Sequence, residues 1–209
     1  TGYTAIDEVI TNNTKALTVQ EVTDAMESGV LVLDTRIADV FEKAFIPGSL
    51  NIGLNGMFAV WVGTLIDINQ PLVLVTDNGK EAETVLRLAR VGYENVIGYL
   101  EGGMQSWITA GKKTDSVTTI QAEDIKQYYD NADYVILDVR KPSEFENEHI
   151  KNAVNIQLSE IDLRAGELDA DKKYIIHCAA GYRSMMAASI LKEKGFNNFV
   201  NVAGGWGSI

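Results

Sequence analysis

The chain of 209 residues has few residues that could fix its fold covalently or hold a metal, with one cysteine, three prolines and two histidines. A single cysteine cannot form an intramolecular disulfide, which fits a reducing compartment, so we expect a cytoplasmic location. The histidines, His149 and His177, lie apart without the spacing of metal ligands. The sequence therefore predicts no metal centre and no other cofactor.

Basic residues are also scarce, since 18 lysines and arginines stand against 29 acidic residues and give a formal net charge of −11. The acidic excess is spread over both halves, so there is no acidic tail and no basic face. Nucleic-acid-binding proteins and proteins that dock on anionic membranes usually cluster lysine and arginine. No apolar run approaches the roughly 18 residues of a membrane-spanning helix. We expect neither nucleic acid nor a membrane as a partner.

The N-terminus, Thr1-Gly2-Tyr3, shows neither an initiator methionine nor a signal-peptide pattern. We expect the chain to be a piece of a longer protein, although a processed chain would look the same. Residues 1–16 match nothing later in the sequence, and we interpret them as a linker or the tail of an upstream domain.

An internal repeat divides the rest of the chain into two copies. Residues 30–36 (VLVLDTR) match residues 134–140 (YVILDVR), and a Phe-Glu pair follows each arginine at the same distance. Later matches include two Gly-Gly pairs, at 102–103 and 204–205. With a boundary in the polar stretch around residues 112–116, the repeat predicts two domains, 17–114 and 115–209.

Each copy alternates short apolar runs with helical patterns. The runs predict strands at 30–33, 72–75, 96–99, 135–137, 175–177 and 199–202. Helices are predicted at 18–28, where Thr18 and Glu21 form a capping box, and at 81–91 and 184–194. Strands that alternate with helices predict an α/β fold in which each copy has a mostly parallel sheet with helices on both faces, a three-layer arrangement.

The second copy contains a loop suited to sulfur chemistry. A predicted strand ends at His177, Cys178 opens the loop, Arg183 closes it and a predicted helix begins near Ser184. Ligands bind at this carboxyl edge of parallel sheets. Inward backbone N–H groups, the helix N-terminus and the Arg183 charge would all favour the thiolate over the thiol. We therefore predict that Cys178 is an exposed, activated nucleophile that can take a sulfane sulfur as a persulfide.

Two simpler interpretations compete with this one. A lone cysteine after an apolar strand is more often a small buried hydrophobic residue, but the Cys–Gly–Arg loop before a helix favours a nucleophile here. His177 is a weaker candidate for a catalytic base, because the last residue of a strand can direct its side chain away from Cys178.

The second copy resembles the rhodanese-homology family. Residues 137–140 (LDVR), Glu144-Phe145 and His149-Ile150 resemble the family's N-terminal signature, residues 178–184 (CAAGYRS) its active-site loop, and Gly204-Gly205-Trp206 its closing turn. The resemblance implies that Cys178 is the catalytic residue and that Asp138 and Arg140 give structural support. It also implies a substrate-binding loop made of Ala179, Ala180, Gly181, Tyr182, Arg183 and Ser184.

The family resemblance implies a sulfurtransferase that moves sulfur from thiosulfate or a low-molecular-weight persulfide to a thiol or another nucleophile. The small, uncharged Ala179 and Ala180 favour a bulkier thiol persulfide over a dianionic donor. One alternative is a regulatory or partner-docking module with a redox-sensing cysteine. Another is a cysteine phosphatase or arsenate reductase, although cysteine phosphatases have a loop that is one residue longer.

The first copy lacks the nucleophile. Its matching segment, residues 75–81 (VTDNGKE), places Thr76 opposite Cys178 and Glu81 opposite Arg183, and no cysteine occurs in this half. We therefore predict a catalytically inactive first copy. Two copies of which the first lacks its cysteine resemble the C-terminal part of bacterial metallo-β-lactamase/rhodanese fusion proteins of the persulfide-dioxygenase type. That resemblance implies an upstream metallo-hydrolase domain as a partner.

Overall fold

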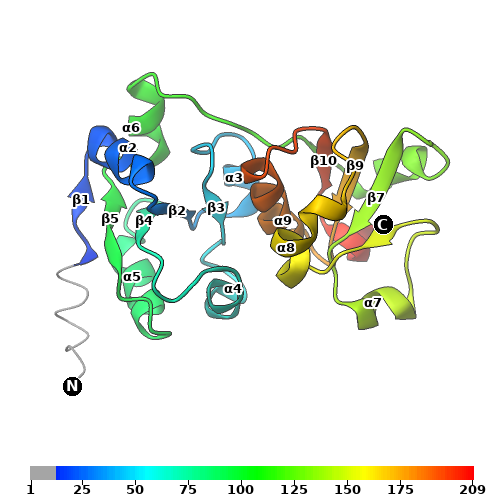
Figure 1. Ribbon diagram of the computed structural model, residues 1–209, viewed down its shortest axis with the longest axis horizontal. Helices are drawn as coiled ribbons and strands as arrows, with labels where there is room; N and C mark the ends of the chain where they lie inside the picture. Colours follow the sequence, from blue (N-terminus) through cyan, green and yellow to red (C-terminus); the bar gives the residue numbers. More distant parts are fainter. Residues whose placement is uncertain (1–12) are drawn as a thin grey trace. The chain divides into compact units, whose positions relative to one another are not determined.

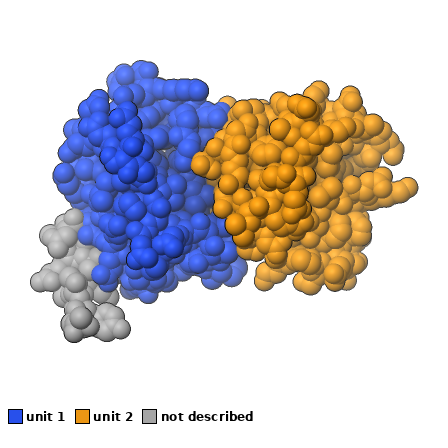
Figure 2. All heavy atoms as spheres, in the orientation of Figure 1, with its two compact units in different colours: residues 1–115 blue, residues 116–209 orange. Residues whose placement is uncertain are grey.

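The computed structural model describes residues 13–209, and the chain divides into two compact units between Asp115 and Ser116. Figure 2 colours the two units separately. Of the predicted linker 1–16, residues 1–12 lie outside the described residues. Ala16 belongs to the first sheet, and the Lys15 carbonyl oxygen accepts a hydrogen bond from Tyr99 N at 2.9 Å. No helix within residues 13–209 has the length and apolar character needed to cross a membrane.

Unit 1 is built on a parallel sheet of five strands (Figure 1). The strand order is β1 (Ala16–Leu17), β5 (Val96–Leu100), β4 (Leu72–Val75), β2 (Leu31–Asp34) and β3 (Leu50–Asn51). The helices are α2 (Val19–Glu27), α3 (Ala38–Phe41), α4 (Phe58–Leu65), α5 (Glu81–Ala89) and α6 (Gly103–Thr109).

Unit 2 repeats this topology. Its strand order is β6 (Thr119–Ile120), β10 (Phe199–Val202), β9 (Lys173–His177), β7 (Tyr134–Asp138) and β8 (Val154–Asn155), again with parallel pairing. The α-helices are α7 (Pro142–Asn147), α8 (Ile161–Arg164) and α9 (Tyr182–Glu193), and the 3₁₀ segments are η1 (Ala122–Tyr128), η2 (Leu158–Glu160), η3 (Ala165–Glu167) and η4 (Gly205–Ser208). The predicted α/β fold class, with two similar parallel-sheet domains, is confirmed.

Alternating side chains bury both faces of each sheet. In β4, Val73 and Val75 pack with Val22 of α2 and Trp107 of α6, while Leu72 and Leu74 are buried on the opposite face. Figure 1 shows α2 and α6 on one side of this sheet and α4 and α5 on the other.

The predicted capping box is present at the start of α2. Thr18 Oγ1 accepts from Glu21 N at 3.2 Å, and a Glu21 side-chain oxygen accepts from Thr18 N at 2.8 Å. This arrangement satisfies two backbone donors that the helix leaves unpaired. The helix ends before Gly29, whose φ of 84° is the left-handed conformation that favours glycine.

One predicted helix start is wrong at the proposed site. Helix α9 begins at Tyr182, two residues before the predicted start at Ser184. Gly181 has a φ of 84° and serves as the N-cap, so the helix starts two residues closer to Cys178 than the apolar pattern suggested. Arg183 consequently lies in the first turn of the helix.

Candidate active site at Cys178

A short loop joins β9 to α9 and holds Cys178 at the carboxyl edge of the unit 2 sheet. The backbone N–H of Gly181 points back at the cysteine and donates to its Sγ at 3.2 Å. Ser184 is buried, and its hydroxyl donates to the Gly181 carbonyl at 3.1 Å. These bonds hold the loop around the sulfur and aim a backbone N–H group at it.

The thiol is less accessible than the sequence predicted. Cys178 is only 1% exposed, whereas Ala179, Gly181 and Tyr182 are half-buried and Ala180 is exposed. The expectation of an exposed thiol is therefore wrong, because the loop folds over its own first residue. A reagent must pass the edge of this loop to reach the sulfur.

A second loop, the closing turn at residues 204–207, supports the first. Trp206 N donates to the Cys178 carbonyl at 2.6 Å, and Gly207 N donates to the Ala179 carbonyl at 3.1 Å. Gly205 has a φ of 58°, and a Cβ there would overlap the Cys178 carbonyl oxygen and lie 2.7 Å from the Ala179 carbonyl carbon. The backbones approach so closely that only glycine fits.

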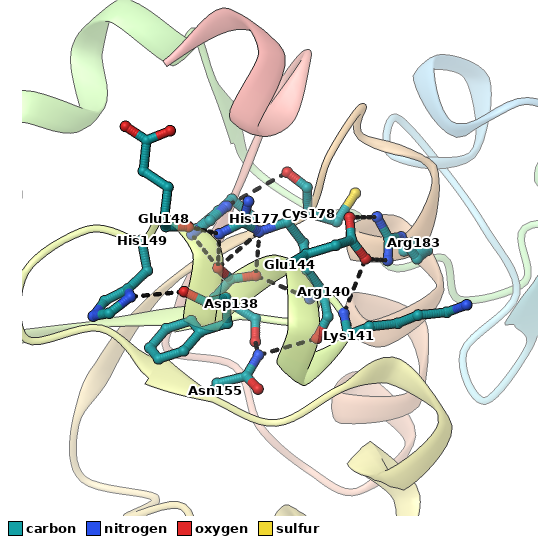
Figure 3. A network of polar contacts seen from close by, with 11 residues as sticks. Asp138, Arg140, Lys141, Glu144, Glu148, His149, Asn155, His177, Cys178 and Arg183 are labelled. Atoms are coloured by element: carbon teal, nitrogen blue, oxygen red, sulfur yellow. Dashed lines mark hydrogen bonds and ion pairs between the residues drawn. The ribbon is translucent and has the colours of Figure 1, made fainter.

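Arg183 is engaged in an ion pair with Glu144 of α7. Its two terminal nitrogens donate to the two carboxylate oxygens at 2.6 and 2.8 Å, in the fork geometry typical of arginine (Figure 3). The hydrogen bonds from Arg183 lower the pKa of Glu144 to about 2. The sequence predicted a positive charge at Arg183 beside the thiol, and the structure pairs this charge with the Glu144 carboxylate.

His177 faces the interior of unit 2. Its Nε2 lies 3.6 Å from Asp138 Oδ2 without a hydrogen bond, and its Nδ1 lies 3.4 Å from the Cys178 carbonyl oxygen. Figure 3 shows the Cys178 sulfur directed away from this ring. Burial lowers the pKa of His177, although the Asp138 carboxylate opposes the shift. This geometry does not favour His177 as a base for the thiol.

Asp138 and Arg140 form a buried pair behind the loop. Arg140 Nε and NH2 donate to the Asp138 carboxylate at 3.0 and 2.7 Å, and the guanidinium also donates to the Glu148 carbonyl at 2.8 Å. Asn155 Nδ2 donates to both backbone carbonyls of the pair, at 2.8 and 3.0 Å. The guanidinium carbon of Arg140 lies 4.2 Å from the centre of the Trp206 ring.

Unit 1 contains the same buried pair without any cysteine. Arg36 donates to Asp34 at 2.9 and 2.5 Å and to the Ala44 carbonyl, and Asn51 spans the backbone of the pair as Asn155 does in unit 2. The formation of this network therefore does not depend on a reactive thiol.

The corresponding loop of unit 1 holds a carboxylate in place of the Arg183 cation. Glu81 Oε1 accepts from the Thr76 hydroxyl at 3.4 Å and from Gly79 N at 3.2 Å. Glu83 pairs with Lys80 at 2.8 Å. Within residues 13–209, no cluster of three or more His, Cys, Asp or Glu side chains could hold a metal ion.

Comparison with known proteins identifies the family. A sequence profile for the Rhodanese-like domain matches this chain twice, over residues 18–110 and 121–209. The chain belongs to the rhodanese-like family. Each matched segment of this rhodanese-like protein falls within one of the two units, and the predicted tandem arrangement is confirmed.

Two of the relatives have names that refer to sulfur carriage or transfer. The chain is 34% identical over 137 residues to the Bacillus subtilis protein named "Putative sulfur carrier protein YrkF", covering 62% of this chain and 74% of the relative. It is 30% identical to a "Sulfurtransferase" of Allochromatium vinosum, covering 43% of this chain and 84% of that protein.

A solved structure is similar in sequence. A rhodanese-related protein of Thermoplasma volcanium is 39% identical to this chain, with a TM-score of 0.39. The matched region covers 42% of this chain and 85% of the Thermoplasma protein. Together with the sulfurtransferase relatives, the family assignment supports a sulfurtransferase-type protein.

Sequence reasoning missed two contributors to the site. Glu144 was recognised only as part of a family signature, because its partner Arg183 lies 39 residues away and only the fold brings them together. Gly205 was recognised only as part of a closing turn. Its positive φ and its contact with the Cys178 backbone depend on a second loop that sequence spacing does not place.

Proposed function

We propose that this rhodanese-like chain is a sulfurtransferase in which Cys178 carries sulfane sulfur as a persulfide. The observation that supports this most is the Gly181 N–H directed at Sγ, 3.2 Å away. It stands at the carboxyl edge of a parallel sheet, beside the N-terminus of α9, a helix of 12 residues. The sulfurtransferase relatives support the same proposal.

The transfer consists of two balanced displacements. The Cys178 thiolate attacks the terminal sulfur of thiosulfate or of a persulfide, so a new S–S bond forms while the donor's S–S bond breaks. Sulfite or the donor thiolate leaves with the electron pair of that bond. An acceptor thiolate or other nucleophile then attacks the outer sulfur and releases the Cys178 thiolate, so the enzyme undergoes no net oxidation or reduction.

The remaining loop residues shape the approach to the sulfur in this proposal. Gly181 supplies a backbone donor, Ser184 fixes the loop, and Ala179, Ala180 and Tyr182 form the edge that the donor must pass. Asp138 and Arg140 act as structural support. Unit 1 is inactive in sulfur transfer, because no thiol stands at Thr76 and the Glu81 carboxylate occupies its loop.

Steady-state kinetics test the proposal against its two alternatives. With donor and acceptor both varied, we expect ping-pong behaviour, seen as parallel double-reciprocal lines, and no turnover for Cys178→Ser. A thiol that alkylates readily but shows no turnover would instead support the redox-sensing module. Hydrolysis of a phosphate ester that disappears in Cys178→Ser would support the phosphatase alternative.

An upstream metallo-hydrolase domain is a further part of the proposal, based only on the order of the two copies and the missing cysteine of the first. The complete reading frame that contains this chain tests it. An upstream segment with metal-ligand spacing would support the fusion, and its absence would refute it.

A further inference from the structure

The active-site loop of unit 2 has a single permanently charged cation, and a carboxylate neutralises it. Arg183 is the only lysine or arginine within residues 177–184. Both of its terminal nitrogens are bound by Glu144, at 2.6 and 2.8 Å. A doubly negative donor that approaches Cys178 therefore finds no free positive charge in the loop itself.

Glu144 stays ionised under any ordinary assay condition. The hydrogen bonds from Arg183 are the main cause that lowers the pKa of Glu144 to about 2, and the hydrogen bond from Lys141 N, 3.1 Å away, lowers it further. Its side chain is 34% exposed, whereas that of Arg183 is 15% exposed. The negative member of the pair is thus the more exposed of the two.

The Cys178 sulfur faces the Arg183–Glu144 ion pair. In Figure 3 the Cys178 sulfur points toward Arg183 and Glu144 and away from His177. Arg183 also interacts electrostatically with Cys178. Charge on the Glu144 carboxylate therefore acts where the donor's terminal sulfur must arrive.

Unit 1 provides an internal comparison. The repeat places Val40 opposite Glu144 and Glu81 opposite Arg183, so neither member of the ion pair exists there. The pair accompanies the thiol and is not a general requirement of the fold.

Resting on the sulfurtransferase function proposed above, we propose that Glu144 is a specificity-determining residue that makes the Cys178 site select organic persulfides over thiosulfate. A protonated persulfide, R–S–SH, brings no charge to the reacting sulfur, so its attack by the thiolate involves one negative charge. Thiosulfate brings two, and three negative charges then gather beside the Glu144 carboxylate. Like charges in a partly desolvated site repel strongly, which raises the barrier more for thiosulfate than for the protonated persulfide.

The test measures the rate of sulfur loading on Cys178 by intact mass with two donors: thiosulfate and the persulfide of N-acetylcysteine methyl ester, which has an uncharged organic part. In Glu144→Gln, we expect the ratio of the thiosulfate rate to the persulfide rate to rise by about tenfold, the size expected when one like charge is removed within several ångströms. The increase should shrink at high salt.

Two matched variants separate charge from structure. Glu144→Asp keeps the charge and should keep the wild-type ratio, and Glu146→Gln removes an exposed carboxylate from the same helix and should also leave it unchanged. An unchanged ratio in Glu144→Gln, or an equal fall of both rates, would overturn the specificity role while leaving the sulfurtransferase function intact. Failure of the wild type to load sulfur from either donor would overturn both proposals.

Discussion

At the scale of single residues, the site combines a shielded sulfur with a buried, uncharged imidazole. Cys178 is 1% exposed and accepts a hydrogen bond from Gly181 N, while His177 is fully buried beside Asp138. The two adjacent side chains thus face different surroundings: the sulfur faces the loop and the ring faces the interior. Their separate roles can be tested one residue at a time.

Shielding of the sulfur predicts selectivity for narrow reagents. We compare the ratio of the rate with a bulky maleimide to the rate with iodoacetamide, for Cys178 and for free cysteine. We expect this ratio to be at least about tenfold lower for Cys178, since reactivity requires access as well as thiolate character. Alkylation rates followed by mass check this. Unfolding in urea should restore the free-cysteine ratio, and an unshifted ratio in the folded chain would show that the loop does not limit access.

The buried His177 predicts a loss of stability in mild acid. Because burial lowers the pKa of His177 below its ordinary value of 6.5, the unfolded chain takes up the proton first as pH falls, and the free energy of unfolding decreases below about pH 6.5. His177→Val copies Val75, its counterpart in unit 1, and should lose less stability between pH 7.5 and 5.5. Urea denaturation at both pH values measures this, and equal losses in both proteins would contradict it.

At the scale of elements, each unit is a parallel sheet whose carboxyl edge is supported by a buried Asp–Arg pair. The pair follows β2 in unit 1 and β7 in unit 2, with the same hydrogen bonds from Asn51 and Asn155. A buried ion pair is costly to break, because removing one partner leaves the other charge unpaired. Because both units contain the same network, we expect the loss of its arginine to destabilise each unit to a similar extent.

We expect Arg36→Leu and Arg140→Leu each to lower the free energy of unfolding of its own unit by about 3–5 kcal/mol, the usual cost of an uncompensated buried charge. Chemical denaturation with a probe in each unit measures the two effects separately. Should Arg140→Leu abolish sulfur transfer at full stability, the pair in unit 2 would be catalytic machinery and our structural interpretation would be wrong.

The closing turn predicts a sharper effect at one glycine. Gly205→Ala would drive a Cβ into the Cys178 and Ala179 backbone, so we expect sulfur loading to fall by about tenfold or more through displacement of the loop. Gly103→Ala is the matched control, because its Cβ would be 3.6 Å from the Thr76 carbonyl oxygen at a similar φ of 57°. Loading rates and circular dichroism of both variants check this. Unchanged loading in Gly205→Ala would show that the turn does not position Cys178.

The strands that were predicted from sequence are those that are mostly apolar. β4 (Leu72–Val75) and β10 (Phe199–Val202) match their predicted limits, because burial on both faces leaves a mainly apolar run, which only Asn201 interrupts in β10. The two-residue edge strands β1, β3, β6 and β8 show no such run and are defined only by pairing with a neighbour. Helix α4 was missed because Phe58–Leu65 is largely apolar and gives no clear helical period.

The polar part of the site could be predicted only where its residues are close together in the sequence. The loop from Cys178 to Arg183 follows from a strand, a glycine and a helix in succession, whereas the Arg183–Glu144 pair joins residues on different elements. Its consequence, a neutralised cation beside the thiol, could not be obtained from spacing within the loop.

At the scale of the whole molecule, two units of one fold share a single cysteine. Unit 1 keeps the sheet order and the buried Asp–Arg pair but has Thr76 where unit 2 has Cys178. Each chain can therefore carry at most one cysteine persulfide.

The most direct test of the central claim is the intact mass of the whole chain after incubation with a sulfane-sulfur donor, for the wild type and for Cys178→Ser. We predict a gain of one sulfur atom on the wild type, reversed by cyanide or a thiol and absent in Cys178→Ser. A wild-type chain that gains no sulfur from thiosulfate or an organic persulfide, while Cys178 remains free to be alkylated, would contradict the claim that this residue carries sulfur.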